Sequence, residues 1–129
     1  MRIPASGKVG IKILVVEDNP DLMRIMCMQL GVMGYHTVAA RTGVQAVELA
    51  VQHVPALITM DITLPDMDGL EAARRIREHP ATRAVPILAV TARSLPEHRQ
   101  RCIDSGCTGY ISKPFTSSTL FERIESLLA

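Results

Sequence analysis

The sequence predicts an α/β fold in which a parallel sheet is covered by helices on both faces. Short apolar runs rich in β-branched residues alternate five times with longer segments of helical periodicity. The apolar runs lack the polar alternation of a half-exposed strand, which is typical of strands buried on both faces. The chain has 129 residues, 47% of them hydrophobic, and this is enough for one domain with a sizeable core.

The five predicted strands are short and evenly spread along the chain. Residues 11–16, 57–60 and 87–90 are nearly continuous apolar runs, whereas residues 36–40 and 109–112 give weaker strand signals. A helical pattern follows each of these runs, so every neighbouring pair of strands is joined by a helix. Such a strand–helix alternation favours parallel pairing.

The first helix has a clear beginning and end. Asn19 is a suitable N-cap, Pro20 suits the first helical position, and Gly34 is a suitable stop. Its predicted apolar face consists of Leu22, Ile25, Met26, Leu30 and Met33. The later helices are predicted from apolar residues at helical spacing or from their flanking Pro and Gly: Val47–Val54, Leu70–Ile76, Pro96–Ser105 and Leu120–Leu128.

Composition excludes several classes of protein. A net charge of +1 gives no electrostatic footprint for nucleic acid or for an anionic membrane surface. Three cysteines without a CxxC pair argue against a disulfide framework or a zinc site, and they indicate a cytoplasmic protein. Residues 1–10 have no apolar core of a signal peptide and are predicted to be a flexible leader, with one domain over 11–129.

Polar side chains follow four of the predicted strands at their carboxyl ends. Glu17 and Asp18 follow the first strand, Asp61 the third, Thr91 the fourth and Lys113 the fifth. In an open α/β sheet, ligands bind outside the carboxyl ends of the strands. We therefore expect three carboxylates, a hydroxyl and an ammonium group to meet at one edge of the sheet.

This combination of groups suits phosphoryl transfer to a carboxylate. Three crowded acids require a cation, and Mg²⁺ binds through one or two carboxylates together with phosphate oxygens. Asp18 and Asp61 are predicted to bind Mg²⁺ directly, and Glu17 through a water molecule. With Asp61 as the phosphoacceptor, Lys113 supplies a positive charge and Thr91 a hydroxyl to the phosphoryl oxygens.

Four motifs, in this order and at this spacing, resemble the response-regulator receiver family of two-component signalling: residues 15–19, 60–69, 90–92 and 112–115. The resemblance extends over residues 11–128 and is greatest to stand-alone receivers and to those of hybrid kinases. It implies a flavodoxin-like, doubly wound, five-stranded parallel sheet in the order 2-1-3-4-5. It also implies Mg²⁺ as cofactor, a third metal contact from the Thr63 backbone carbonyl, and a cis bond before Pro114.

The resemblance implies a signalling switch rather than an enzyme. A histidine kinase or a histidine phosphotransfer domain would phosphorylate Asp61, and the surface of the fourth helix, fifth strand and fifth helix would then bind a downstream protein. The domain would support its own phosphorylation and dephosphorylation, and we expect no room for an output domain after the fifth helix. The alternatives are a receiver-like binding module that takes no phosphate, and a phosphatase of the haloacid dehalogenase kind. The phosphatase is disfavoured because residues 61–63 lack the second acid of its DxD motif.

Three further roles are predicted for individual residues. Tyr110 lies where the family often has an aromatic that moves inward on phosphorylation, together with Thr91. Thr63 and Arg93 lie two positions beyond the phosphoacceptor and the hydroxyl residue, where members of the family vary most, and they are predicted to tune the phosphoryl lifetime. Asp66 and Asp68 are expected only to shape the turn before Gly69.

A partner surface is predicted on the first helix. Met23, Cys27 and Met28 fall off its predicted apolar face, and exposed methionine provides an adaptable contact surface. In the family this helix docks against the helical hairpin of the kinase or against a phosphotransfer domain.

Overall fold

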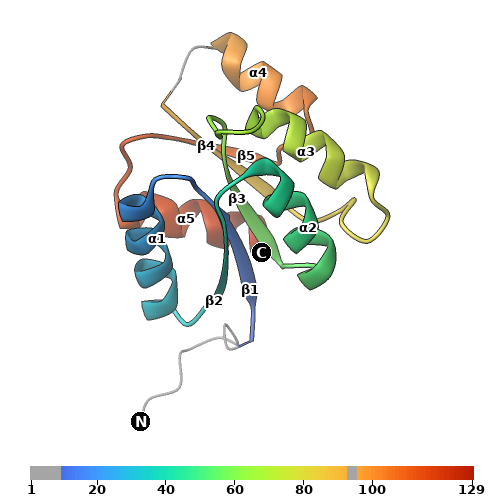
Figure 1. Cartoon of the computed structure of the whole chain (residues 1–129). Coiled ribbons are helices and arrows are strands. Elements are labelled where there is room, and N and C mark those ends of the chain that lie inside the picture. Colours follow the sequence, from blue (N-terminus) through green and yellow to red (C-terminus); the bar gives the residue numbers. More distant parts are fainter. Residues whose placement is uncertain (1–9, 93–95) are drawn as a thin grey trace.

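The computed structural model describes residues 10–92 and 96–129 and shows five strands alternating with five helices (Figure 1). The strands are β1 (Lys12–Val16), β2 (His36–Ala40), β3 (Leu57–Asp61), β4 (Ile87–Thr91) and β5 (Gly109–Ser112). The helices are α1 (Pro20–Val32), α2 (Gly43–His53), α3 (Gly69–Glu78), α4 (Pro96–Asp104) and α5 (Ser117–Leu128). The ends of each predicted strand agree with those of an observed strand to within one residue.

The five strands form a parallel sheet in the order β2-β1-β3-β4-β5, which confirms the predicted order. Two hydrophobic clusters cover its two faces. Helices α2, α3 and α4 pack on one face, and α1 and α5 pack on the other (Figure 1). Successive residues of β1 point to opposite faces, so Ile13 belongs to one cluster and Leu14 to the other. The core is therefore two layers divided by the sheet, as in other doubly wound folds.

The buried face of α1 differs from the predicted one. Met23, Met26 and Leu30 are its buried residues, whereas Ile25 is largely exposed. The prediction that Met23 contributes to a partner surface is wrong, because this side chain is only 6% exposed and packs beneath the helix. Nearly every position from 22 to 28 is apolar, so the periodicity alone does not determine which stripe faces the sheet.

The residues at the helix ends and turns adopt the conformations that the sequence predicts. Asn19 caps α1 by accepting hydrogen bonds from the amides of Asp21 and Leu22. Gly34 and Gly106 have positive φ angles, and the Lys113–Pro114 peptide is cis. The predicted flexible leader, apart from Gly10, lies outside the described residues, as does Arg93.

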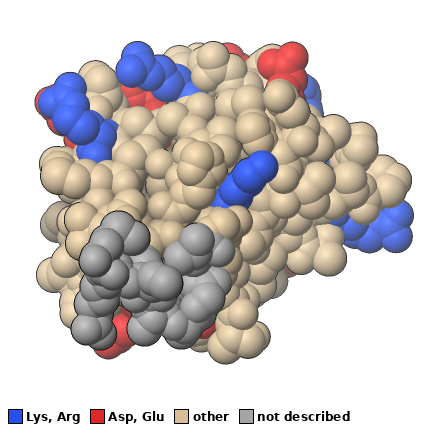
Figure 2. All heavy atoms as spheres, turned by 90° about the horizontal axis from the view of Figure 1, so that it is seen from below, with Lys and Arg blue, Asp and Glu red and all other residues tan. Residues whose placement is uncertain are grey.

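All five strands run in the same direction, so their carboxyl ends meet at the upper edge of the sheet in Figure 1. The opposite side, seen from below, shows few and scattered charged side chains (Figure 2). Over residues 10–92 and 96–129, no helix combines the length and the apolar character needed to cross a membrane.

Candidate phosphoacceptor site

Three carboxylates meet at the carboxyl ends of β1 and β3. Glu17 and Asp18 directly follow β1, and Asp61 is the last residue of β3. Each offers an oxygen atom, and these atoms lie within 4.8 Å of one another. Glu17 and Asp61 are 2% and 4% exposed, whereas Asp18 is open to solvent. The parallel pairing of β1 with β3 places these two strand ends side by side, as predicted.

Lys113 reaches the carboxylates from the end of β5. Its Nζ atom lies 3.1 Å from Glu17 Oε1 and 3.4 Å from Asp61 Oδ2. Its backbone amide donates to the Thr91 carbonyl at 2.7 Å, so the lysine is anchored to the neighbouring strand end. The ammonium group thereby partly offsets two buried negative charges.

Glu17 has both carboxylate oxygens engaged. Oε1 pairs with Lys113, and Oε2 accepts a hydrogen bond from the Asn19 amide at 3.0 Å. The residue that caps α1 therefore also orients a buried acid of the site.

The environment of Asp61 disfavours its negative charge. Burial, together with a close contact to Glu17 and the charge of Glu17, raises the pKa of Asp61 from 3.8 to about 6. The Thr63 amide, which donates to Asp61 Oδ1 at 3.1 Å, and the charge of Lys113 act in the opposite direction but do not outweigh burial. Asp61 is thus an acid whose ionised form would be stabilised by an additional cation.

The residues present fit a magnesium ion. The cluster offers hard carboxylate oxygens and no thiolate or imidazole, which matches the preference of Mg²⁺ over softer metals. Asp18 is exposed to solvent, so an ion here could keep several waters, as Mg²⁺ does. Burial and the neighbouring Glu17 carboxylate raise the pKa of Asp61, and the charge of Lys113 does not outweigh them, so a further cation would stabilise the ionised acid.

The loop from β3 to α3 forms one wall beside Asp61. Thr63 is exposed and pairs with Asp68 in a short antiparallel bridge, and Asp68 caps α3 through the Leu70 amide at 2.8 Å. A Cβ atom on Gly69 would lie 2.1 Å from the Asp61 carbonyl oxygen. Only glycine permits this close approach, which explains the Asp-Gly pair of the motif.

Asp66 has a role that the sequence analysis missed. The sequence predicts only a turn-shaping role for Asp66, but its carboxylate accepts hydrogen bonds from the Gly43 and Val44 amides at the start of α2. These partners are 22 and 23 residues away in the sequence, and no local pattern signals the contact.

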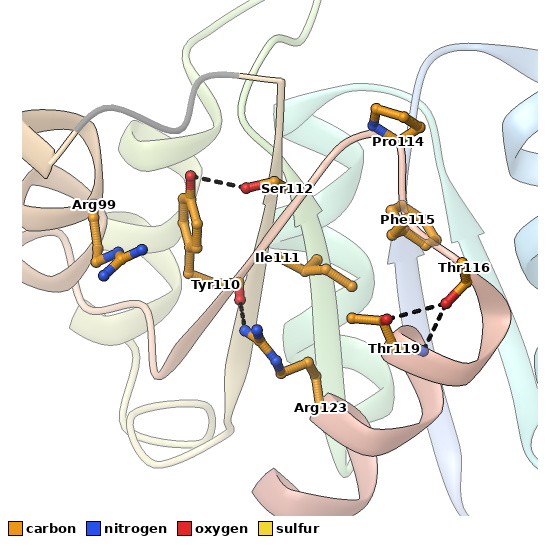
Figure 3. A pocket seen from close by; sticks show the side chains of 9 residues that line it. All are labelled: Arg99, Tyr110, Ile111, Ser112, Pro114, Phe115, Thr116, Thr119 and Arg123. Carbon is orange, nitrogen blue, oxygen red and sulfur yellow. Dashed lines mark hydrogen bonds between the residues drawn. The ribbon is translucent and has the colours of Figure 1, made fainter.

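Thr91 and Tyr110 lie on the adjacent strands β4 and β5. Thr91 is buried at the end of β4, and Tyr110 is half-buried. The Ser112 hydroxyl lies 3.2 Å from the Tyr110 hydroxyl, and the Arg99 guanidinium lies over the ring, 5.2 Å from its centre (Figure 3). Arg123 of α5 donates to the Tyr110 carbonyl. The tyrosine therefore connects α4, β5 and α5.

Comparison with known proteins identifies the family of this chain. Residues 13–125 match the response regulator receiver domain family. The polar-differentiation response regulator DivK of Brucella ovis is 37% identical over 116 residues, which are 90% of this chain and 94% of that protein. DivK of Brucella anthropi shows the same identity and coverage.

Solved structures share both the fold and part of the sequence. The receiver domain of sensor histidine kinase PA1611 from Pseudomonas aeruginosa, which has a magnesium ion in its active site cleft, is 36% identical with a TM-score of 0.87, covering 93% of this chain and 98% of that one. The chemotaxis protein CheY4 of Vibrio cholerae is 29% identical with a TM-score of 0.88, covering 92% and 98%. This chain belongs to the response regulator receiver domain family of two-component signal transduction.

Proposed function

We propose that this domain is a phosphoacceptor switch in a two-component phosphorelay, and that Asp61 receives the phosphoryl group. The observation that carries the proposal is the buried Asp61 carboxylate, which lies 3.4 Å from Lys113 and within 4.8 Å of Glu17 and Asp18 oxygens. The site thus brings together a nucleophile, a cation for the phosphoryl oxygens and two further acids for a metal.

In the proposed step, a carboxylate oxygen of Asp61 forms a bond to phosphorus as the bond from phosphorus to the donor imidazole breaks. The imidazole nitrogen leaves with the electron pair and takes up a proton. Lys113 and the Thr91 hydroxyl bind the phosphoryl oxygens. Asp18, Asp61 and the Thr63 carbonyl would hold Mg²⁺, and Glu17 would contact it through water. The bound ion would neutralise charge on the acids and on the phosphoryl group.

A kinase or phosphotransfer partner is proposed to dock on the exposed side of α1. With Met23 buried, the remaining surface consists of Met28, 60% exposed, the half-buried Cys27, and the exposed Ile25 and Val32. The three free cysteines fit the proposed cytoplasmic location. Replacing Met28 with Asp should slow phosphorylation by a cognate phosphodonor protein and leave phosphorylation by acetyl phosphate unchanged. An equal decrease in the rate of phosphorylation with both donors would contradict a docking role for α1.

A downstream partner is proposed to bind the surface of α4, β5 and α5. A groove of about 560 Å³ opens here, lined by Tyr110, Phe115, hydroxyl side chains and two arginines, Arg99 and Arg123 (Figure 3). Movement of Thr91 toward the phosphoryl group would leave space for Tyr110 and reshape this groove. Adding the phosphate mimic BeF₃⁻ should shift the backbone amide resonances of Thr91 and Tyr110 together. Shifts confined to Asp61 and its sequence neighbours would leave Tyr110 without a switching role.

The phosphoryl lifetime is proposed to depend on Thr63 and Arg93. Thr63 is exposed beside Asp61, and its short β-branched side chain has little reach to position a hydrolytic water. Arg93 would shield the phosphoryl oxygens. Thr63→Asn and Arg93→Ala should both shorten the lifetime, measured by decay of labelled protein after removal of the donor. Unchanged lifetimes in both variants would dismiss these roles.

One experiment tests the central proposal directly. Incubation with acetyl phosphate and Mg²⁺ should raise the mass of the protein by one phosphoryl group. Asp61→Asn or chelation of the metal should abolish the increase, and Glu122→Gln, at an exposed acid of α5 outside the cluster, should leave it unchanged. Full labelling of the Asp61→Asn protein would show that the acceptor lies elsewhere.

A further inference from the structure

The loop between β3 and α3 is tied to the start of α2 by one carboxylate. Asp66 Oδ1 accepts from the Gly43 amide at 2.7 Å, and Oδ2 accepts from the Val44 amide at 3.0 Å. The first amides of a helix have no partner within the helix, and negative charge is favoured there. These two hydrogen bonds lower the pKa of Asp66, so the contact favours the ionised carboxylate.

The neighbouring residue Met67 makes a second contact between the same two segments. A Cβ atom on Gly43 would lie 2.3 Å from Met67 Cγ and 2.6 Å from its sulfur. The absence of a side chain at Gly43 therefore lets Met67 lie directly against the backbone of α2. The far end of the loop is held by the hydrogen bonds that Asp66 accepts from α2 and by the packing of Met67 against Gly43.

The base of the same loop adjoins the phosphoacceptor. Thr63 pairs with Asp68 across the loop, and the Thr63 amide donates to Asp61 Oδ1 at 3.1 Å. The Gly69 amide donates to the Ile62 carbonyl at 2.8 Å and closes the loop. Six residues, 63–68, lie between Ile62 and Gly69, so Asp66 lies three residues from Thr63 within the same closed loop.

We propose that Asp66 is a positioning residue, which holds the β3–α3 loop on α2 and thereby fixes the backbone at Thr63 for metal binding beside Asp61. The inference rests on the proposed function, because it takes the Thr63 carbonyl as a ligand of Mg²⁺. Residues that orient metal ligands from outside the first coordination sphere commonly change affinity 10- to 100-fold when they are replaced. Asp66 itself does not touch the metal or the phosphoryl group.

The matched control is Thr42, which caps the same helix and, among the described residues, forms no hydrogen bond to the loop. Its hydroxyl accepts from the Gln45 amide at 3.1 Å. Asp66→Ala and Thr42→Ala each remove hydrogen bonds from the start of α2, but only Asp66→Ala releases the loop. Mg²⁺ binding would be measured by calorimetric titration of the wild type and both variants. Exchange of the Thr63 amide hydrogen would be measured in the metal-free proteins.

We expect Asp66→Ala to weaken Mg²⁺ binding by about 10-fold and to speed exchange of the Thr63 amide, with both unchanged in Thr42→Ala. Asp66→Asn, which keeps an oxygen acceptor, should give an intermediate effect and serves if the alanine variant does not fold. Unchanged values in Asp66→Ala, or equal losses in Asp66→Ala and Thr42→Ala, would overturn the inference.

A wild-type protein that does not bind Mg²⁺ would instead contradict the proposed function. The exchange measurement then decides the inference by itself, because it needs no metal. Faster exchange of the Thr63 amide in Asp66→Ala alone would support the positioning of the backbone at Thr63, and equal exchange in all variants would overturn it.

Discussion

Replacing Asp61 with asparagine should stabilise the metal-free protein. The substitution keeps the size of the side chain and removes a charge that its surroundings disfavour. Asp61 is buried, and Glu17 provides a second negative charge at close range. A residue placed for chemistry rather than for stability commonly shows this behaviour.

The magnitude follows from the pKa of Asp61, which rises from 3.8 to about 6 in the folded protein. A difference of about 2 units corresponds to about 3 kcal/mol at pH values above both pKa values. Solvent at the mouth of the site screens part of this repulsion, so we expect about 1–2 kcal/mol. For a domain of this size, that stability corresponds to a rise of roughly 4–8 °C in Tm.

The pH dependence has a definite sign. Because the folded-state pKa is the higher one, the folded protein holds a proton on Asp61 more tightly than the unfolded chain does. The contribution of Asp61 to the free energy of unfolding of the wild type is therefore greatest below about pH 4. It falls as the pH rises through about 6 and is constant at higher pH. Asp61→Asn should lack this loss, so its advantage over the wild type should appear between these pH values.

Urea unfolding in the presence of a chelator, from pH 4 to pH 8, would measure this difference. Glu122→Gln is the matched control, because it removes one carboxylate charge from an exposed position on α5. Mg²⁺ at ten times its Kd should stabilise the wild type by about 1.4 kcal/mol and stabilise Asp61→Asn less. If Asp61→Asn were no more stable than the wild type at pH 8, or if its advantage did not depend on pH, the reasoning would be refuted.

Three further substitutions test other parts of the structure by the same urea unfolding. Val54→Gly should raise the free energy of unfolding by about 1 kcal/mol, because Val54 ends α2 at a φ of 43°, which disfavours a β-branched side chain. The Val54 side chain is 48% exposed, so little packing is lost, and a less stable variant would contradict the strain. Arg77→Met should lower the free energy of unfolding by about 2 kcal/mol, because the carbonyls of Thr82 and Gly106 would lose their hydrogen-bond donor. An unchanged stability would mean that water replaces the guanidinium as donor. Lys113→Met should lower the free energy of unfolding by about 3 kcal/mol without metal, because the buried Glu17 would lose its cation. Mg²⁺ should restore part of this stability, and an unchanged urea midpoint would show that the ion pair does not stabilise the fold.

Local sequence determined the order and the limits of the elements. The runs at β1, β3 and β4 are apolar on both faces, and such strands are compatible only with a sheet covered on both sides. Parallel strands place their carboxyl ends at one edge. The meeting of Glu17, Asp18, Asp61 and Lys113 was therefore predictable without coordinates, and the structure brings these four residues together.

Tertiary packing alone decided which side of α1 is buried. The stretch from 22 to 28 offers apolar side chains in almost every direction, so several rotations of the helix would bury a similar area. The sheet selects Met23, Met26 and Leu30, and it leaves Ile25 and Met28 outside. The complementarity of two packed surfaces makes this choice, and the sequence of one of them does not contain it.

The same holds for the groups that surround the phosphoacceptor. The sequence placed Asp66 in a turn, but its hydrogen bonds to Gly43 and Val44 join segments more than 20 residues apart. The raised pKa of Asp61 likewise depends on burial and on the distance to Glu17, which exist only once β1 and β3 are paired. Residue types and spacing thus determined which chemical groups gather at the sheet edge. Folding determined their charge states and supports, because desolvation and long-range hydrogen bonds depend on distances in space rather than along the chain.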